Sequence, residues 1–207
     1  MRDWGKSLKH FHDTASGMSK RYRYEALQSF SIDKLAEAVR APDHALHKTP
    51  EVVDDLSEAL HEASQDVDRA TASQPERFLH GDVHRSNCAG NPVVLFDLDY
   101  SGWGPLPHDF STIALGVHRY GWPGKYLDEF KRAYGSEAPT HSEIAPFLRL
   151  RELVTCGWVM QFAIPRAPEN LQELPGRLRA IKDPSHTADP WIHAGDFAMM
   201  DSSRLRI

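Results

Sequence analysis

The sequence predicts a mostly α-helical protein of the α+β class, with a small β-hairpin near its middle. Apolar residues recur at helical spacing through most of the 207 residues. Two short apolar runs, 77–80 and 92–96, break this pattern and have the length of strands. Polar and turn-forming residues lie between them, so we expect the two strands to form a hairpin that carries a polar loop.

We expect one domain over residues 1–207, and its first region, 1–75, is predicted to be helical. Thr49 and Pro50 suit the cap and the first position of a helix. Apolar spacing predicts three helices in this region, over residues 4–15, 22–39 and 50–70.

The region 76–105 holds the hairpin and its loop, and helices return in the region 106–182. The longest of these helices begins at a capping box formed by Thr140 and Glu143. The tail, 183–207, is rich in Pro, Asp, His and Ser, and we expect it to be irregular. The helices expected after the hairpin cover 109–117, 126–134, 140–162 and 169–174.

Charge and hydropathy exclude several classes of partner. The net charge of −5 gives no sign of the basic surface that nucleic-acid binding needs. No apolar run is long enough for a membrane-spanning helix, and the first residues lack the apolar core of a signal peptide. We therefore expect a cytoplasmic protein with no nucleic-acid and no membrane partner.

Four side chains with oxygen donors lie in and beside the predicted hairpin. Asp82 and Asn87 belong to the loop after the first strand, and Asp97 and Asp99 end the second strand. A hairpin would bring the two pairs together. Magnesium prefers carboxylate and amide oxygens, and a further Asp that does not bind metal can accept a proton from a hydroxyl group. These are the parts that phosphoryl transfer requires on one side of its site.

In this order and spacing the residues resemble the aminoglycoside phosphotransferase and choline kinase-like family. The first helix, in which Leu8 and His12 stand near the end, is also similar to a helix of that family. The resemblance implies the C-terminal lobe of a protein-kinase-like fold. The segments that carry it are His80-Gly81-Asp82-Val83-His84, Asn87, Asp97-Leu98-Asp99, Gly102-Trp103-Gly104-Pro105 and Asp109.

The resemblance further implies an ATP-dependent transfer of phosphate to a hydroxyl group of a small molecule. Asp82 would be the catalytic base. Asn87 and Asp97 would bind Mg²⁺, which bridges the phosphates of ATP.

The remaining residues of the motif would complete the cofactor-binding side of the site. His80 and His84 would shape the loop that faces the cofactor. Asp99 would contact a second metal ion, or it would hydrogen-bond to the ligands of the first without binding the metal itself. Asp109 would cap its helix and brace the loop.

The sequence departs from the family in two places, and alternatives follow. Arg85-Ser86 replaces the usual Pro and small residue of the loop. No Gly-rich phosphate loop and no lysine in a β-branched strand precedes His80, so the N-terminal nucleotide lobe is missing from the pattern. A catalytically incomplete remnant or binding module, or a partner chain that supplies the nucleotide lobe, therefore stays open. A metal-dependent hydrolase that uses His80, Asp82 and His84 is a further alternative.

Overall fold

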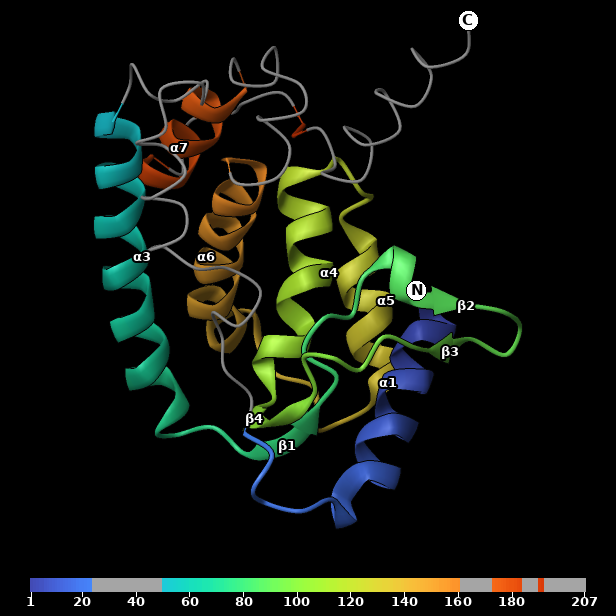
Figure 1. Cartoon of the computed structure of the whole chain (residues 1–207). Coiled ribbons are helices and arrows are strands. Elements are labelled where there is room, and N and C mark those ends of the chain that lie inside the picture. The colour runs from blue at the N-terminus through green and yellow to red at the C-terminus, as the bar shows by residue number, and fades with distance from the viewer. Residues whose placement is uncertain (24–49, 161–172, 184–189, 192–207) are drawn as a thin grey trace, which may run out of the picture. The chain divides into compact units, whose positions relative to one another are not determined.

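The computed structural model describes residues 1–23, 50–160, 173–183 and 190–191 (Figure 1). The chain divides into two compact units. The first comprises Met1–Gln28 and Gln65–Arg151, and the second comprises Ser29–Ser64 and Glu152–Ile207. The expectation of one domain with four regions stays a prediction. No helix of the described residues is long and apolar enough to cross a membrane.

Helices that pack on one apolar core build most of the first unit. α1 lies beside α5 (Figure 1). Their close approach requires a glycine, since a Cβ atom at Gly5 would lie 2.4 Å from the carbonyl oxygen of Phe130. Val83 of the central loop is buried in the same core, so the packing that holds the helices also holds the loop. This unit includes α1 (Arg2–Thr14), the short η1 (Ala15–Gly17), the end of α3 (Pro50–Thr71), α4 (Pro107–Arg119), α5 (Lys125–Tyr134) and the first part of α6 (His141–Trp158).

Two small antiparallel pairs of strands lie beside these helices. β1 (Glu76–Leu79) pairs with β4 (Gly102–Pro105), so that Phe78 stands opposite Trp103. The other pair is a hairpin, but the predicted pairing of 77–80 with 92–96 is wrong: β1 pairs with β4, and the second predicted strand pairs with a short strand that was not predicted. This hairpin consists of β2 (Cys88–Ala89), which follows the short η3 (Arg85–Asn87), and β3 (Val94–Leu95).

β4 was not predicted as a strand, because Gly and Pro are depleted in strands and its pattern does not alternate. All four of its residues are buried. The segment after α1 pairs with its edge: the backbone N–H of Trp103 donates to the carbonyl of Tyr22 at 2.7 Å, and Arg23 forms a bridge to the same residue. The helix predicted over 22–39 is therefore wrong at its first two residues, where pairing with a buried edge replaces helical bonds. The rest of that range lies outside the described residues.

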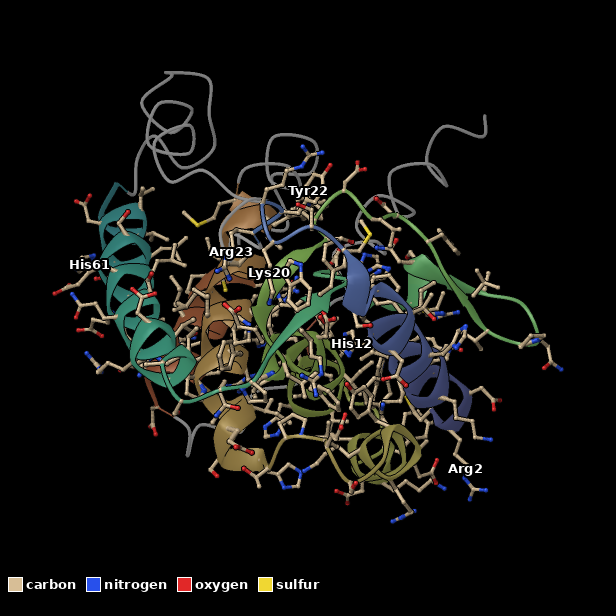
Figure 2. All side chains as sticks on the ribbon, turned by 90° about the horizontal axis from the view of Figure 1, so that it is seen from below. Arg2, His12, Lys20, Tyr22, Arg23 and His61 are labelled. Atoms are coloured by element: carbon tan, nitrogen blue, oxygen red, sulfur yellow. The ribbon has the colours of Figure 1, made fainter. Side chains whose placement is uncertain are left out.

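Side chains reinforce this strand edge. The Lys20 ammonium lies 3.2 Å from the centroid of the Trp103 ring, and Lys20 and Arg23 both form ion pairs with Glu76. Figure 2 shows Lys20, Tyr22 and Arg23 gathered together after α1. The chain that leaves α1 is thus tied to the sheet that leads into the central loop.

The helices predicted over 4–15, 50–70, 109–117 and 126–134 and the described part of the helix predicted over 140–162 are confirmed, with small differences at their ends. α3 (Pro50–Thr71) has Pro50 at its first position and ends before Pro75. The capping box of α6 is formed as expected: the Thr140 backbone N–H donates to Glu143 at 2.6 Å, and the Glu143 N–H donates to the Thr140 hydroxyl at 3.3 Å.

The second unit contains the first part of α3, the end of α6 and α7 (Leu174–Lys182). Lys182 on α7 forms an ion pair with Asp55 on α3 at 2.9 Å. The guanidinium of buried Arg177 stacks on the Trp191 ring, 4.8 Å from its centroid. α7 begins where the helix predicted over 169–174 was expected to end. Most of that range, and nearly all of the tail expected to be irregular, lie outside the described residues.

Candidate active site

The loop between β1 and β2 carries the first half of the expected site, and its backbone is folded on itself. The His84 N–H donates to the Asp82 carbonyl at 3.0 Å, and the Asn87 N–H donates to the His84 carbonyl at 2.9 Å. The Phe96 N–H donates to the Asn87 carbonyl at 3.1 Å, which extends the hairpin by one residue pair. Asn87 therefore stands opposite Phe96, the residue that precedes Asp97.

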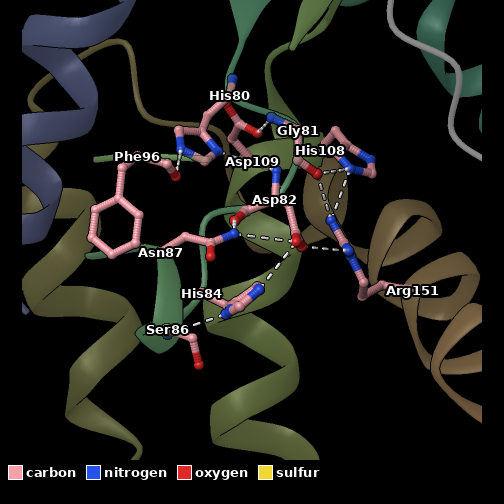
Figure 3. A network of polar contacts seen from close by, with 10 residues as sticks. All are labelled: His80, Gly81, Asp82, His84, Ser86, Asn87, Phe96, His108, Asp109 and Arg151. Atoms are coloured by element: carbon pink, nitrogen blue, oxygen red, sulfur yellow. Dashed lines mark hydrogen bonds and ion pairs between the residues drawn. The ribbon is translucent and has the colours of Figure 1, made fainter. Parts of the chain in front are cut away.

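Asp109, at the start of α4, holds the first residues of this loop (Figure 3). Its carboxylate is completely buried and accepts hydrogen bonds at 2.8 Å from the backbone N–H groups of His80 and Gly81. It also lies 2.9 Å from His12 Nε2. Burial alone would raise the pKa of Asp109, but the hydrogen bond from His12 and the charges of the neighbouring histidines lower it to about 2. The carboxylate is thus ionised and fixes the loop backbone.

His12 extends the anchoring network to a third helix. It points from α1 into the interior of the unit (Figure 2). Its Nδ1 lies 2.7 Å from the hydroxyl of Tyr134 on α5, while Nε2 faces Asp109. Three helices therefore converge on the carboxylate that holds the loop.

Gly81 is required by the backbone path of the loop. Its φ of 85° is in the left-handed region, and a Cβ atom there would lie 2.2 Å from the carbonyl oxygen of Tyr100. The loop can approach the chain after β3 this closely only with glycine at this position.

His80 connects the two halves of the site through both ring nitrogens. Its Nδ1 accepts from the Asp82 backbone N–H at 3.4 Å, so Nε2 carries the proton and donates to the Phe96 carbonyl at 3.1 Å. The ring is completely buried. The expectation that His80 shapes the loop agrees with this geometry.

Asp82 lies half-buried among hydrogen-bond donors. Its Oδ2 is 3.0 Å from His84 Nε2 and 3.3 Å from the side-chain amide of Asn87. Its Oδ1 is 3.2 Å from Nη1 of Arg151 on α6. Burial would raise the pKa of Asp82, but the hydrogen bond from His84 and the charge of Arg151 outweigh it and hold the pKa below its usual range. Asp82 is therefore a carboxylate at neutral pH.

Asn87, Asp97 and Asp99 leave oxygen atoms available. The amide nitrogen of Asn87 donates to Asp82, and within the described residues nothing donates to its Oδ1. Asp97 and Asp99 are exposed, and their carboxylates have no hydrogen-bond or ion-pair partner in the described part of the chain. This donor set of two carboxylates and one amide oxygen fits Mg²⁺.

Asp97 has an unusual backbone. Its φ of 66° is the only positive value at a non-glycine residue in the described ranges. Such a conformation costs free energy, and it persists where the surrounding structure or a function requires it. The strain turns the chain directly after the hairpin, at the residue expected to bind metal.

Arg151 and His108 were not predicted as part of the site. Arg151 Nη2 donates to the Gly81 carbonyl at 2.8 Å and lies 3.0 Å from His108 Nε2 (Figure 3). Burial and then the charge of Arg151 lower the pKa of His108 to about 3, so this histidine is neutral. The sequence contained one weak indication of Arg151: it is a charged residue in the helix that carries the longest apolar stripe of the sequence.

The geometry does not favour the hydrolase alternative. Both ring nitrogens of His80 are engaged by backbone groups, so neither is left to bind zinc. His84 and Asp82 pair with each other. In the portion of the chain that the structure describes, no group of three or more His, Cys, Asp or Glu residues is placed to hold a metal ion.

Comparison with solved structures identifies the class of fold. Choline kinase LicA of Streptococcus pneumoniae superposes with a TM-score of 0.56 at 14% identity, covering 86% of this chain and 64% of that protein. A choline/ethanolamine kinase family protein of Mesorhizobium loti gives 0.56 at 17% identity, with coverages of 98% and 65%. A spectinomycin phosphotransferase in its AMP-bound complex gives 0.52 at 18% identity, with coverages of 88% and 63%. The fold is therefore the mostly helical part of a kinase-like fold.

The chain belongs to the phosphotransferase enzyme family, whose sequence profile matches residues 1–147. This confirms the family that the motif resembles. No curated protein matches the chain significantly in sequence. The chain spans less than two thirds of the length of each of the three structures above.

Proposed function

We propose that this chain carries the catalytic and metal-binding half of an ATP-dependent phosphotransferase, which transfers the γ-phosphate to a hydroxyl group of a small molecule. Residues 1–207 would form the C-terminal lobe of the kinase-like fold. The observation that carries the proposal is the arrangement around Asp82, where an ionised carboxylate lies beside Asn87, and Asn87 pairs with the strand that leads into Asp97. A cytoplasmic location suits a reaction that consumes ATP.

Asp82 is the proposed catalytic base, and its two oxygens are held differently. Oδ2 faces two donors, His84 and Asn87, whereas Arg151 is the one donor to Oδ1 among the residues that the structure describes. A carboxylate oxygen has two lone-pair sites. Oδ1 therefore keeps one site for the hydroxyl group of the acceptor, and it is the atom that would receive the proton.

Asn87 Oδ1 and the carboxylate of Asp97 are the proposed magnesium ligands, with Asp99 as a further contact on the same side. Bound magnesium would supply the positive charge that neutralises the phosphates during transfer. His80 and His84 hold the loop so that these oxygens face the cofactor. Asp109 supports the loop from within the core.

Transfer of labelled γ-phosphate tests the proposal. The purified chain is incubated with magnesium, labelled ATP and a panel of hydroxyl compounds that includes choline, ethanolamine and spectinomycin. We expect transfer to at least one compound, and we expect Asp82→Asn to lower kcat by at least about 100-fold. Asp68→Asn on the exposed face of α3 is the matched control and should leave kcat unchanged. Equal activity of the Asp82→Asn and wild-type proteins would refute the role of Asp82.

The incomplete-remnant alternative is separated by calorimetry with magnesium and ATP. A functional site predicts a Kd below about 1 mM, or a binding free energy of roughly −4 kcal/mol or better. Weaker binding, together with no transfer to any acceptor, would favour the remnant. A separate chain that supplies the nucleotide lobe has no support from the comparisons.

A further inference from the structure

Arg151 is the only residue outside the loop whose side chain contacts the Asp82 carboxylate, as far as the described residues show. It comes from α6, far along the chain from the motif. Its side chain is 13% exposed, so it is held largely away from water. An ion pair with this degree of burial is more persistent than one on the surface, where the median contribution is small.

Three contacts of the guanidinium stand out among the described residues. A guanidinium only donates. Nη1 donates to Asp82 Oδ1 at 3.2 Å, and Nη2 donates to the Gly81 carbonyl at 2.8 Å. Nη2 also lies 3.0 Å from His108 Nε2, which is itself 3.2 Å from the Gly81 carbonyl. The contacts with the loop backbone and with His108 on α4 fix the plane of the guanidinium independently of its contact with the Asp82 carboxylate.

The consequence concerns the rotation of the Asp82 side chain. The donors within the loop, His84 and Asn87, both bind Oδ2. Turning the carboxylate about its Cβ–Cγ bond moves both oxygens, so the contacts on Oδ2 already oppose this rotation. The contact of Arg151 opposes it at the second oxygen, Oδ1, and comes from outside the loop.

We propose that Arg151 is a positioning residue, which directs Asp82 Oδ1 toward the acceptor hydroxyl from a fixed guanidinium plane. The inference rests on the proposed function, in which Asp82 Oδ1 receives the proton of the acceptor hydroxyl. Lysine is a poor substitute: one ammonium group cannot span Asp82, the Gly81 carbonyl and His108 in a single plane. The role therefore depends on the shape of the side chain as well as on its charge.

A double-mutant cycle tests the contact without any need for turnover. Unfolding in urea is measured for wild type, Arg151→Gln, Asp82→Ala and the double variant. If Arg151 acts through Asp82, the two changes couple by about tenfold in the unfolding equilibrium constant. Additive effects of the two changes would overturn the inference, whether or not the chain is active.

Kinetics tests the positioning role. We expect Arg151→Gln to lower kcat at least about tenfold while KM for ATP and for the acceptor changes less than about twofold. Arg151→Lys should recover only a minor part of kcat, and added guanidinium at low concentration should restore turnover of Arg151→Gln but not of Asp82→Asn. Arg132→Gln, at an exposed position on α5, is the control.

The outcomes distinguish this inference from the proposed function. An active wild type with an equally active Arg151→Gln variant overturns the inference and leaves the proposed function standing. An inactive wild type contradicts the proposed function, and the coupling measured in urea then decides alone whether Arg151 holds Asp82. Full recovery of kcat by Arg151→Lys would also overturn the inference, since a positive charge alone would then be sufficient.

Discussion

Three aspartates of the site are held in three different ways. Asp109 is completely buried and accepts three hydrogen bonds. Asp82 is half-buried between two side-chain donors, His84 and Arg151. Asp97 is exposed, with strained backbone and no partner among the described residues. The contribution to stability should therefore fall from Asp109 to Asp97, while the contribution to the proposed chemistry lies with Asp82 and Asp97.

The strain at Asp97 gives a prediction in which stability and activity change in opposite directions. Asp97→Gly removes the steric cost of a positive φ, which is about 1 kcal/mol or more for a residue with a Cβ atom. Glycine also gains freedom in the unfolded chain, so we expect the free energy of unfolding to stay level or rise by roughly 0.5 kcal/mol. Phosphate transfer should be lost, because the proposed magnesium ligand is gone. Urea unfolding and the transfer assay measure the two effects.

Asp99→Gly is the matched control for this change. Asp99 is also exposed and lies two residues away, but it has no positive φ. The same substitution there should lower the free energy of unfolding by roughly 0.5 to 1 kcal/mol, because only the entropic cost of glycine remains. Equal losses of stability at both positions would contradict the interpretation of Asp97 as strained.

At the scale of elements, the site depends on helices that are distant in sequence. α1 supplies His12, α4 supplies Asp109 and His108, α5 supplies Tyr134, and α6 supplies Arg151. Each side chain makes its contact in this network only when its helix is packed correctly. The packing of α1 on α5 should therefore affect the anchoring of the loop as well as the core.

Gly5→Ala tests this dependence. The added methyl group would meet the Phe130 carbonyl oxygen at 2.4 Å and the Ala133 Cβ at 3.1 Å, so α1 and α5 must move apart. We expect a loss of roughly 2 kcal/mol in the free energy of unfolding, measured in urea. Gly17→Ala, where an added Cβ has no neighbour within 4 Å, is the control and should be neutral. A neutral Gly5→Ala would show that the two helices can separate without cost.

The elements that sequence analysis predicted are those with local signals. The capping box at Thr140 and the apolar spacing of α1 are defined within a few residues. The strands at 77–80 and 92–96 were predicted from local apolar runs, but their pairing with each other was wrong, because partners depend on contacts that a local pattern does not contain. β4 was missed because its stability comes from pairing with β1, which is distant in sequence. Such pairing overrides the low strand propensity of Gly and Pro.

The site follows the same rule as the elements: residues within one contiguous motif were predicted, and residues that depend on distant contacts were not. Asp82, Asn87 and Asp97 belong to one contiguous motif, so their order and spacing were sufficient. His12, His108 and Arg151 act through contacts between helices. The sequence shows which residues they are, but it does not show which residues they contact in the fold. The one hint was Arg151, a charged residue in a helix with an apolar stripe, because a charged side chain that packs against a core needs a partner.

At the scale of the whole molecule, the fold persists at 14–18% identity to the three compared structures. Few side chains can be shared at this level. The buried polar network around Asp109 and His108 is one part of the molecule where substitutions are costly, because each buried polar group needs its partner. Its protonation should therefore affect the stability of the folded chain.

The stability of the chain against acid follows from the state of His108. The pKa of this buried histidine is lowered from 6.5 to about 3 by burial and by the charge of Arg151. The unfolded chain takes up a proton near pH 6.5, whereas the folded chain does so only near pH 3. The stabilisation is therefore complete above the unfolded pKa, and it is lost as the pH falls from 6.5 toward 3. The loss has an upper bound of roughly 5 kcal/mol.

His108→Gln separates this contribution from other acid effects. Glutamine can still accept from Arg151 but does not titrate, so the fall in unfolding free energy between pH about 7 and about 4 should be much shallower than in wild type. Urea unfolding at several pH values measures the slope. The same change at His10, which is exposed on α1, controls for the loss of a histidine. Parallel slopes for wild type and His108→Gln would mean that His108 does not control acid unfolding. Asp109 extends the effect to lower pH, since its pKa of about 2 lies below the ordinary 3.8 and its stabilisation is lost only in that lower window.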